Sequence, residues 1–588
     1  MKLRTSSSDM TILKKDITRF APAWVLYIVA SLLTLLLIVQ FDTGYYLAEI
    51  VATSAIPMAF CAFCYAFLVA ELLFGDLFNA RLCNALHAMP MRRERWFGTH
   101  VTAGILFGFV PHLIFAVLSG LMMDELWKTA LLWMLAVDLQ YLFFFSLAVF
   151  SMLCVGNRFA AAMVYGLLNF LSLIAAWFID TLYLPMLYGL ELDVTLFELL
   201  CPLSQMLDSY QLIDVSRTRA NETAPWIYKV SCGEGWLYLA VCAVIGVLLL
   251  LAALSFYRRR KLESAGDFIA VQALEPIFLV LYTLTVGAML HILSNIIADE
   301  VSYIFLTAGI AIGFFTGQMF IKRTIRVFSK KTFLGFAVFA LVLWGSLGLT
   351  KLDPLGITRW IPQTDEVESV TLQFRSSYYG TITLDEAEEI EDMRYVHAKA
   401  LENRIHLDYD YSSYYRAEDG TRHPVAQIVL SYKLKNGATA QRHYPIAVDT
   451  VAGERLRRYF SSREFVLGLD LETAEEYVDK LYFFEVDSHQ VLDDAQKIGL
   501  MEAILADCDA GNMVQVGEFH DDETTSFYTW FQYDEHVKLP STEYRYRDLR
   551  IYDCCENVKK WVSENIDPDW MEDDFDKTEA TIPAQSGS

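Results

Sequence analysis

The sequence predicts a polytopic α-helical membrane protein that ends in a water-soluble α+β domain. Residues 1–350 contain nine apolar runs long enough to cross a bilayer, whereas the remainder alternates short apolar and polar stretches. Charge is divided at the same place. Residues 1–350 hold 23 basic and 23 acidic side chains, and residues 351–588 hold 24 basic against 48 acidic ones, which accounts for the net charge of −24.

A helix needs about 20 predominantly apolar residues to cross a hydrocarbon core of roughly 30 Å. The predicted spans lie near residues 24–40, 50–74, 101–121, 126–155, 159–183, 235–256, 276–294, 301–320 and 333–349. We therefore divide the chain into five parts. These are a lead helix in residues 1–22, six spans in 23–256, three spans in 257–350, an α+β domain in 351–566 and an acidic disordered tail in 567–588.

The distribution of basic residues predicts the orientation. Lys and Arg favour the cytoplasmic ends of spans, and alternate connections carry them, from the lead to the clusters at residues 92–95, 258–261 and 322–331. The opposite connections are mostly acidic. The N-terminus is therefore expected inside and the C-terminal domain outside, and we expect the first apolar run to be an anchor rather than a cleaved signal.

The lead itself has helical spacing. Its apolar residues, Met10, Leu13, Ile17 and Phe20, recur opposite its basic residues, Lys14, Lys15 and Arg19. This pattern predicts a helix that lies on the inner membrane surface, with a frayed basic tail as the alternative.

The connection in residues 75–100 carries the best functional candidate. We predict that Asp76 caps a helix whose apolar face is Phe78, Leu82, Leu86 and Met89, and that Pro90 ends it. A cationic exit follows in Arg92, Arg93 and Arg95, with Trp96 at the membrane interface. A cytosolic partner could bind such a helix. The alternative is an interfacial anchor whose charges only obey the positive-inside rule.

The stretch from Asn79 to Trp96, with Leu86, Pro90 and Arg93 at the spacing Leu-x-x-x-Pro-x-x-Arg, resembles the coupling-helix region of ABC-2 type exporter permeases. Residues 1–22 are similar to that family's cytosolic connecting helix, and residues 184–210, with two prolines, to its half-inserted extracellular helices. Permeases of clostridial type with a soluble C-terminal extension are similar over most of the chain, which implies a bacterial protein of the cell membrane.

The resemblance implies a permease subunit, with two permease chains and two cytosolic ATPase subunits in the working complex. This chain contains no G-x-x-x-x-G-K-[ST] loop. We therefore expect no enzymatic activity and no cofactor on this chain, with ATP and Mg used by the partner. The implied ATPase-coupling residues are Asp76, Phe78, Arg81, Leu82, Leu86, Met89, Pro90, Arg92, Arg93, Arg95 and Trp96.

Polar residues inside spans give a second candidate site, because a charge in the bilayer is expensive unless it is paired or wet. Asp138 lies near the middle of the fourth predicted span, close to Gln140, and His112 lies in the third. His112 could bond to Asp138 if the two helices pack. Both a structural polar clamp and a transport or proton site fit this pattern.

The C-terminal domain is expected to contain two related β-α-β-β-α units. The predicted strands are 370–374, 427–434 and 438–446, then 480–485, 526–533 and 544–552; the predicted helices are 385–403, 450–460, 495–510 and 556–564. Asn436-Gly437 predicts a tight hairpin turn. Asp408 and Asp410 begin a calcium-loop pattern that lacks its Gly and final Glu, so we expect no metal.

Two functional hypotheses remain open. The first is an exporter permease for an amphipathic, lipid-like or peptide substrate, in contact with membrane lipid. The second is a membrane-anchored sensor with an outer ligand-binding domain. The acidic surface excludes nucleic acid as a partner, because phosphate backbones require Lys and Arg.

Overall fold

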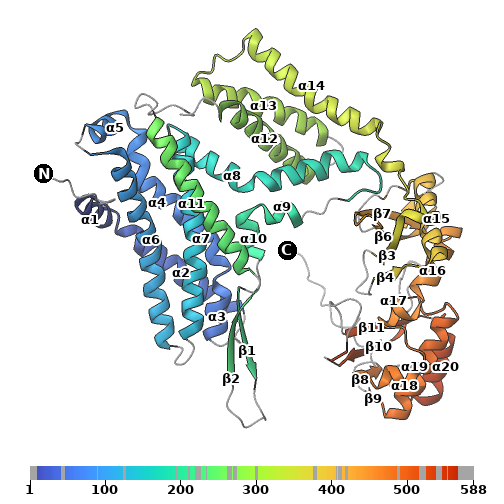
Figure 1. The fold of residues 1–588 in the computed structure, drawn as a ribbon. Coiled ribbons are helices and arrows are strands. Elements are labelled where there is room, and N and C mark those ends of the chain that lie inside the picture. The colour runs from blue at the N-terminus through green and yellow to red at the C-terminus, as the bar shows by residue number, and fades with distance from the viewer. Residues whose placement is uncertain are drawn as a thin grey trace, which may run out of the picture. The chain divides into compact units, whose positions relative to one another are not determined.

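The computed structural model divides into two compact units, each described here by itself (Figure 1). The first, called the membrane unit, comprises residues 1–182 and 192–347, and the second, called the outer unit after its predicted location, comprises residues 183–191 and 348–588. The structure describes residues 9–41, 47–88, 91–122, 127–191, 195–208, 212–218, 227–233, 235–260, 268, 274–297, 302–374, 381–405, 407, 414–416, 421–486, 490–514, 525–534, 536–537, 546–552 and 554–566.

Within the described residues, eight helices are long and apolar enough to cross a membrane, and a bent pair, α1 with α2, makes a ninth if it is one span. Helices of this length and apolar composition indicate a multi-pass membrane protein. The helices are α1 (Met10–Arg19), α2 (Pro22–Phe41), α4 (Pro57–Phe74), α6 (Arg93–Met122), α7 (Trp127–Cys154), α8 (Arg158–Phe178), α11 (Trp236–Arg259), α12 (Glu275–Ile297), α13 (Ser302–Lys322) and α14 (Lys330–Leu352).

The second predicted span, 50–74, is wrong as a single helix. The chain forms α3 (Leu47–Ser54), turns through Ala55 and Ile56, and begins α4 with Pro57 at its first position. Proline has no backbone N–H and clashes with the preceding turn, so it starts a helix more readily than it continues one.

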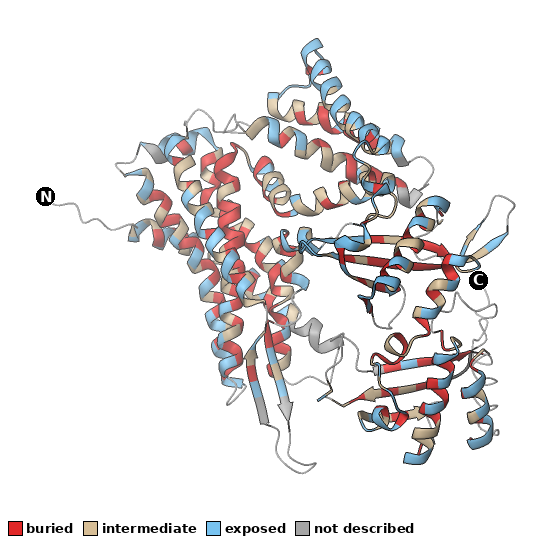
Figure 2. Ribbon diagram, turned by 45° about the vertical axis from the view of Figure 1, so that its right-hand side comes forward, coloured by how far each residue is buried: buried red, intermediate tan, exposed pale blue. Residues whose placement is uncertain are grey.

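Helix α7 lies at the centre of the membrane unit, where it packs against α4, α6 and α11. Most of its second half is buried, and buried residues concentrate in this group of helices (Figure 2). The contact with α6 is close because glycines face α7. A Cβ on Gly104 would come within 2.0 Å of the Phe145 ring, and one on Gly108 within 2.2 Å of Tyr141. The three additional helices include the tightly packed pair α12 and α13.

The segment between α8 and α11 holds short elements. A π-helical turn (Ile179–Tyr183) and a 3₁₀ turn (Leu184–Met186) extend α8, and α9 (Thr195–Leu199) and α10 (Pro202–Asp208) follow. An antiparallel hairpin, β1 (Ile213–Thr218) with β2 (Ile227–Cys232), comes next. The sequence analysis did not predict this hairpin.

The outer unit contains two antiparallel sheets with the same element order. In the first half, β3 (Val367–Phe374) and β4 (Ile382–Leu384) precede α15 (Ala387–Asn403), and β6 (Arg422–Leu434) and β7 (Thr439–Ala447) precede α16 (Val451–Phe460). The second half repeats this order. Its elements are β8 (Leu481–Val486), β9 (Gln490–Val491), α19 (Asp494–Asp509), β10 (Thr525–Tyr533), β11 (Tyr546–Tyr552) and α20 (Glu556–Asn565).

The strand order also repeats. The sheets run β4-β3-β6-β7 and β9-β8-β10-β11, with the short β5 (Tyr414–Arg416) beside β6 in the first. The two halves, joined through α17 (Arg463–Leu467) and α18 (Ala474–Val478), share one hydrophobic core. Every predicted strand and helix of this domain has a counterpart, and Gly437 has the expected positive φ of 84°. Residues 408–413 and 567–588 lie outside the described part of the chain.

Candidate functional site

The connection between α4 and α6 differs from the predicted single helix. A 3₁₀ turn (Gly75–Phe78) comes first, and α5 (Ala80–His87) begins only after the extended residue Asn79. The Asn79 side chain caps α5, because its Oδ1 accepts hydrogen bonds from the N–H groups of Arg81 (3.0 Å) and Leu82 (3.4 Å). The prediction that Asp76 caps this helix is therefore wrong. The Asp76 carboxylate instead lies 4.0 Å from Arg19 of α1.

The four residues of the predicted apolar face do not lie on one continuous helix, because Phe78 belongs to the 3₁₀ turn and Leu82 to α5. Leu82 is 46% exposed and the neighbouring Cys83 is buried, while Phe78 packs against the core of the membrane unit. Arg81 is exposed. Leu86 lies in α5, but its side chain is not described; Met89 and Pro90 lie outside the described residues.

The three arginines that follow have different environments. The Arg93 guanidinium donates from Nη1 to the carbonyls of Tyr257 (3.3 Å), Arg258 (3.3 Å) and Arg260 (3.0 Å) at the C-terminal end of α11. A cation there bonds to carbonyls at the helix end and complements the helix dipole. Arg95 lies 3.6 Å from the carboxylate of Asp9, the N-cap of α1. Arg92 is exposed, and its carbonyl accepts the first bonds of α6.

Trp96 is buried in the membrane unit, and its position at the membrane interface stays a prediction. Its ring meets Phe74 edge-on at 5.6 Å and lies 4.1 Å from the His100 ring and 5.4 Å from Tyr257. Because α6 begins at Arg93, Trp96 is already in its first turn, where it faces α4 and α11.

Further polar contacts surround the base of this connection, and the sequence analysis did not pair them. Carboxylate oxygens lie close to nitrogens of basic side chains in Asp16–His100 (2.7 Å, not aligned as a hydrogen bond), Glu71–Arg158 (2.6 Å) and Glu94–Arg258 (3.1 Å). These contacts join α1, α4, α6, α8 and α11. The sequence signal for these pairs was an acidic residue among the predominantly basic residues at these helix ends.

The structure brings the intramembrane pair His112 and Asp138 together. His112 Nδ1 lies 2.6 Å from Asp138 Oδ1, and His112 Nε2 lies 2.9 Å from the hydroxyl of Tyr27. The contact joins α2, α6 and α7. Tyr27 stacks on Tyr65 of α4, with ring centroids 3.9 Å apart. Tyr27 was missed because one tyrosine in a long apolar run carries no pairing signal.

Gln140 does not belong to this group. It stands two residues after Asp138, which on a helix turns its side chain to about the opposite side. Its Nε2 donates to the carbonyl of Ala55 at 3.2 Å, in the break between α3 and α4. Gln140 thus satisfies a backbone group that the broken helix leaves without an intrahelical partner.

The chemistry of the His112 group follows from its partners. In one tautomer of His112, Nδ1–H donates to Asp138 and Nε2 accepts from the Tyr27 hydroxyl. His112 and Tyr27 are buried, whereas the Asp138 side chain is 21% exposed. The arrangement can fasten three helices together, and it can also pass a proton between an accessible carboxylate and a buried phenol.

Comparison with protein-family models, curated proteins and solved structures found no match to this chain. Fold and site therefore define only a broad class of protein, one with several apolar helices long enough to cross a membrane and a second compact unit of α+β type.

Proposed function

We propose that this chain is the membrane-spanning permease subunit of an ATP-driven exporter of the ABC-2 type. In this proposal the N-terminus is inside, the outer unit faces outward, and the ATPase is a separate cytosolic chain. A second permease chain completes the pore. The substrate is an amphipathic, lipid-like or peptide molecule.

The geometry of α5 is the observation that supports this proposal best. The exposed side chains Arg81 and Leu82 stand on a short helix. The chain on both sides of that helix contacts the bundle, through Phe78 against its core and through Arg93 to α11. A partner that pushes on α5 would therefore move several spans and not only a loose loop.

The test is ATP hydrolysis by the complex purified from its native host in mild detergent. We expect a cytosolic ATPase to co-purify, and the double variant Arg81→Glu/Leu82→Asp to lower its binding or its stimulation by this chain. The matched control is Lys331→Glu, the same kind of charge reversal at an exposed residue of α14. A complex that forms and hydrolyses ATP equally well with both variants would contradict the coupling role of α5.

The alternative is a membrane-anchored sensor without transport activity. The outer unit favours this hypothesis because it has its own large hydrophobic core. A preparation from the native host that contains no ATPase, together with ligand binding by the outer unit, would support the sensor over the exporter.

A further inference from the structure

A segment between two membrane helices belongs to the outer unit. Residues 183–191 follow α8 in the chain, yet they are grouped with residues 348–588. The N–H of His443, on the edge strand β7, donates to the carbonyl of Gly189 at 3.0 Å. The ring of Tyr188 lies 5.5 Å from that of Tyr444, and the Arg404 guanidinium lies 5.9 Å from Tyr188. Tyr188 packs against the core of the outer unit.

Tyr444, which this segment contacts, is hydrogen-bonded to buried polar side chains. The hydroxyl of Tyr444 lies 2.8 Å from His397 Nε2, and His397 Nδ1 lies 3.2 Å from the hydroxyl of Tyr432. All three residues are buried. Burial, followed by the nearby Arg442 and Arg394, lowers the pKa of His397 to about 3, so the ring is neutral near pH 7. These hydrogen bonds hold the Tyr444 side chain in one position.

Only glycine fits at position 189. Its φ is +81°, a conformation that side-chain-bearing residues rarely adopt. A Cβ there would lie 2.1 Å from the Tyr444 ring. The close approach of the backbone to this ring is therefore a specific feature of the segment.

The chain runs from the membrane helix to this contact without an irregular loop. α8, the π-helical turn and the 3₁₀ turn form a continuous helical stretch of 29 residues, Arg158–Met186. Tyr188 follows two residues later, which limits the intervening reach to about 7 Å. π-helical turns inside helices are frequent at functional positions.

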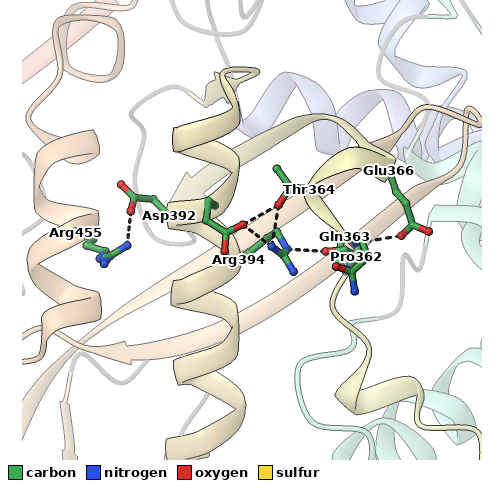
Figure 3. A network of polar contacts seen from close by, with 8 residues as sticks. Pro362, Gln363, Thr364, Glu366, Asp392, Arg394 and Arg455 are labelled. Carbon is green, nitrogen blue, oxygen red and sulfur yellow. Dashed lines mark hydrogen bonds and ion pairs between the residues drawn. The ribbon is translucent and has the colours of Figure 1, made fainter.

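The chain enters the outer unit a second time after α14. This second connection is hydrogen-bonded to α15 (Figure 3). Arg394 donates from Nε to the carbonyl of Pro362 (2.7 Å) and from Nη1 to Thr364 (2.8 Å), and Thr364 donates to Glu391 (2.7 Å). Arg394 and His397 are three residues apart on α15 and so lie on one side of that helix. Helix α15 therefore bonds to the α14 connection through Arg394 and, through His397, to Tyr444, on which Tyr188 packs.

We propose that the Tyr188–Gly189 contact is a clamp through which the outer unit and the outer end of α8 move together. α15 links this clamp to the α14 connection, so a change in the outer unit reaches α8, and a movement of α8 reaches the outer unit. The proposal needs only a multi-pass membrane protein and does not depend on an ATPase partner.

The experiment is hydrogen–deuterium exchange of the full-length chain in lipid nanodiscs, without any partner protein. Gly189→Trp is compared with Gly437→Trp, which has the same positive φ and no atom within 4 Å of its Cβ. We expect Gly189→Trp to speed exchange about tenfold or more in residues 183–191, at the His443 amide and in the last turns of α8. Gly437→Trp should leave these amides unchanged.

Tyr188→Ala serves as a second variant, because it removes the ring without adding bulk, and it should act at the same amides. The proposal is overturned if both variants leave residues 183–191 protected. It is equally overturned if exchange rises at His443 while the last turns of α8 stay as in the unmodified protein.

Discussion

Arg93 and Arg92 are adjacent, but only Arg93 holds another helix. Its guanidinium reaches three carbonyls at the end of α11, whereas Arg92 is exposed. We predict that Arg93→Gln lowers the free energy of unfolding by on the order of 1–2 kcal/mol, because charged hydrogen bonds and a helix-dipole contact are lost. Thermal unfolding in detergent measures this, with Arg92→Gln as the control that should unfold like the parent. Equal effects of the two variants would contradict the capping role.

The His112 group allows the structural and the proton-transfer interpretations to be separated. Asp138→Asn keeps an oxygen that can accept from His112, whereas Asp138→Leu leaves that ring nitrogen buried without a partner. We predict that the Leu variant is less stable than the Asn variant by about 1–3 kcal/mol. Unfolding in detergent measures the difference.

Transport assays then decide the role of the Asp138 charge. A structural clamp predicts that the stably folded Asp138→Asn variant retains activity. Loss of activity in that variant, without loss of stability, would favour a proton-transfer site.

The buried His397 makes the stability of the outer unit depend on pH. The unfolded side chain takes up a proton below its ordinary pKa of about 6.5, whereas the folded one resists it down to a pKa of about 3. The unfolded state therefore binds more protons between these values, and acid lowers the free energy of unfolding by up to about 1.4 kcal/mol per pH unit.

Unfolding midpoints at pH 7 and pH 5 measure this effect. We predict a smaller difference between the two midpoints for His397→Leu, even though that variant loses two hydrogen bonds and is less stable at pH 7. An unchanged pH dependence would show that other groups cause it.

At the scale of elements, the contact between α6 and α7 depends on missing side chains. Gly108 has the Tyr141 ring 2.2 Å from where its Cβ would be, whereas Gly166 of α8 has no atom within 4 Å. Alanine is intrinsically favoured over glycine in a helix by about 1 kcal/mol. We therefore predict opposite signs: Gly108→Ala destabilises the protein, and Gly166→Ala is neutral or slightly stabilising. Thermal unfolding in detergent tests this, and destabilisation by both would contradict the packing argument.

Which elements could be predicted depended on how strong their local signal is. Membrane helices were found because their apolar runs are long, and the β6–β7 hairpin because Asn436-Gly437 has a defined turn chemistry. The α3–α4 break escaped because Pro57 lies within an apolar run. β4 and β9 escaped because strands of three and two residues carry almost no periodicity. In the candidate site, Asn79 took the capping role assigned to Asp76, since both residue types cap helices well.

At the scale of the whole molecule, the distribution of basic residues predicts which parts face the cytoplasm. We expect an epitope inserted at the exposed Gly437 turn to bind antibody on intact cells, because this turn belongs to the outer unit. The same epitope at the N-terminus should become accessible only after permeabilisation. Immunofluorescence measures both, and a Gly437 epitope hidden in intact cells would contradict the predicted orientation.

Long-range contacts were the part of the molecule that the sequence could not specify. The pairing of His112 with Asp138 was a hypothesis that needed two helices to pack, and the third member, Tyr27, lies in another helix again. The seating of Tyr188 on Tyr444 joins residues far apart in the chain. Such contacts depend on how complete helices and sheets pack, for which one sequence gives no local pattern.

The outer unit is not a continuous stretch of polypeptide, and this limits its modularity. A fragment that began after α14 would lack residues 183–191, leaving the His443 amide and the Tyr444 ring uncovered at the edge of β7. Open strand edges promote pairing between molecules. A transferable outer domain must therefore carry that segment with it. Grafting this domain onto another membrane protein would therefore require insertions at two separate places in the recipient gene.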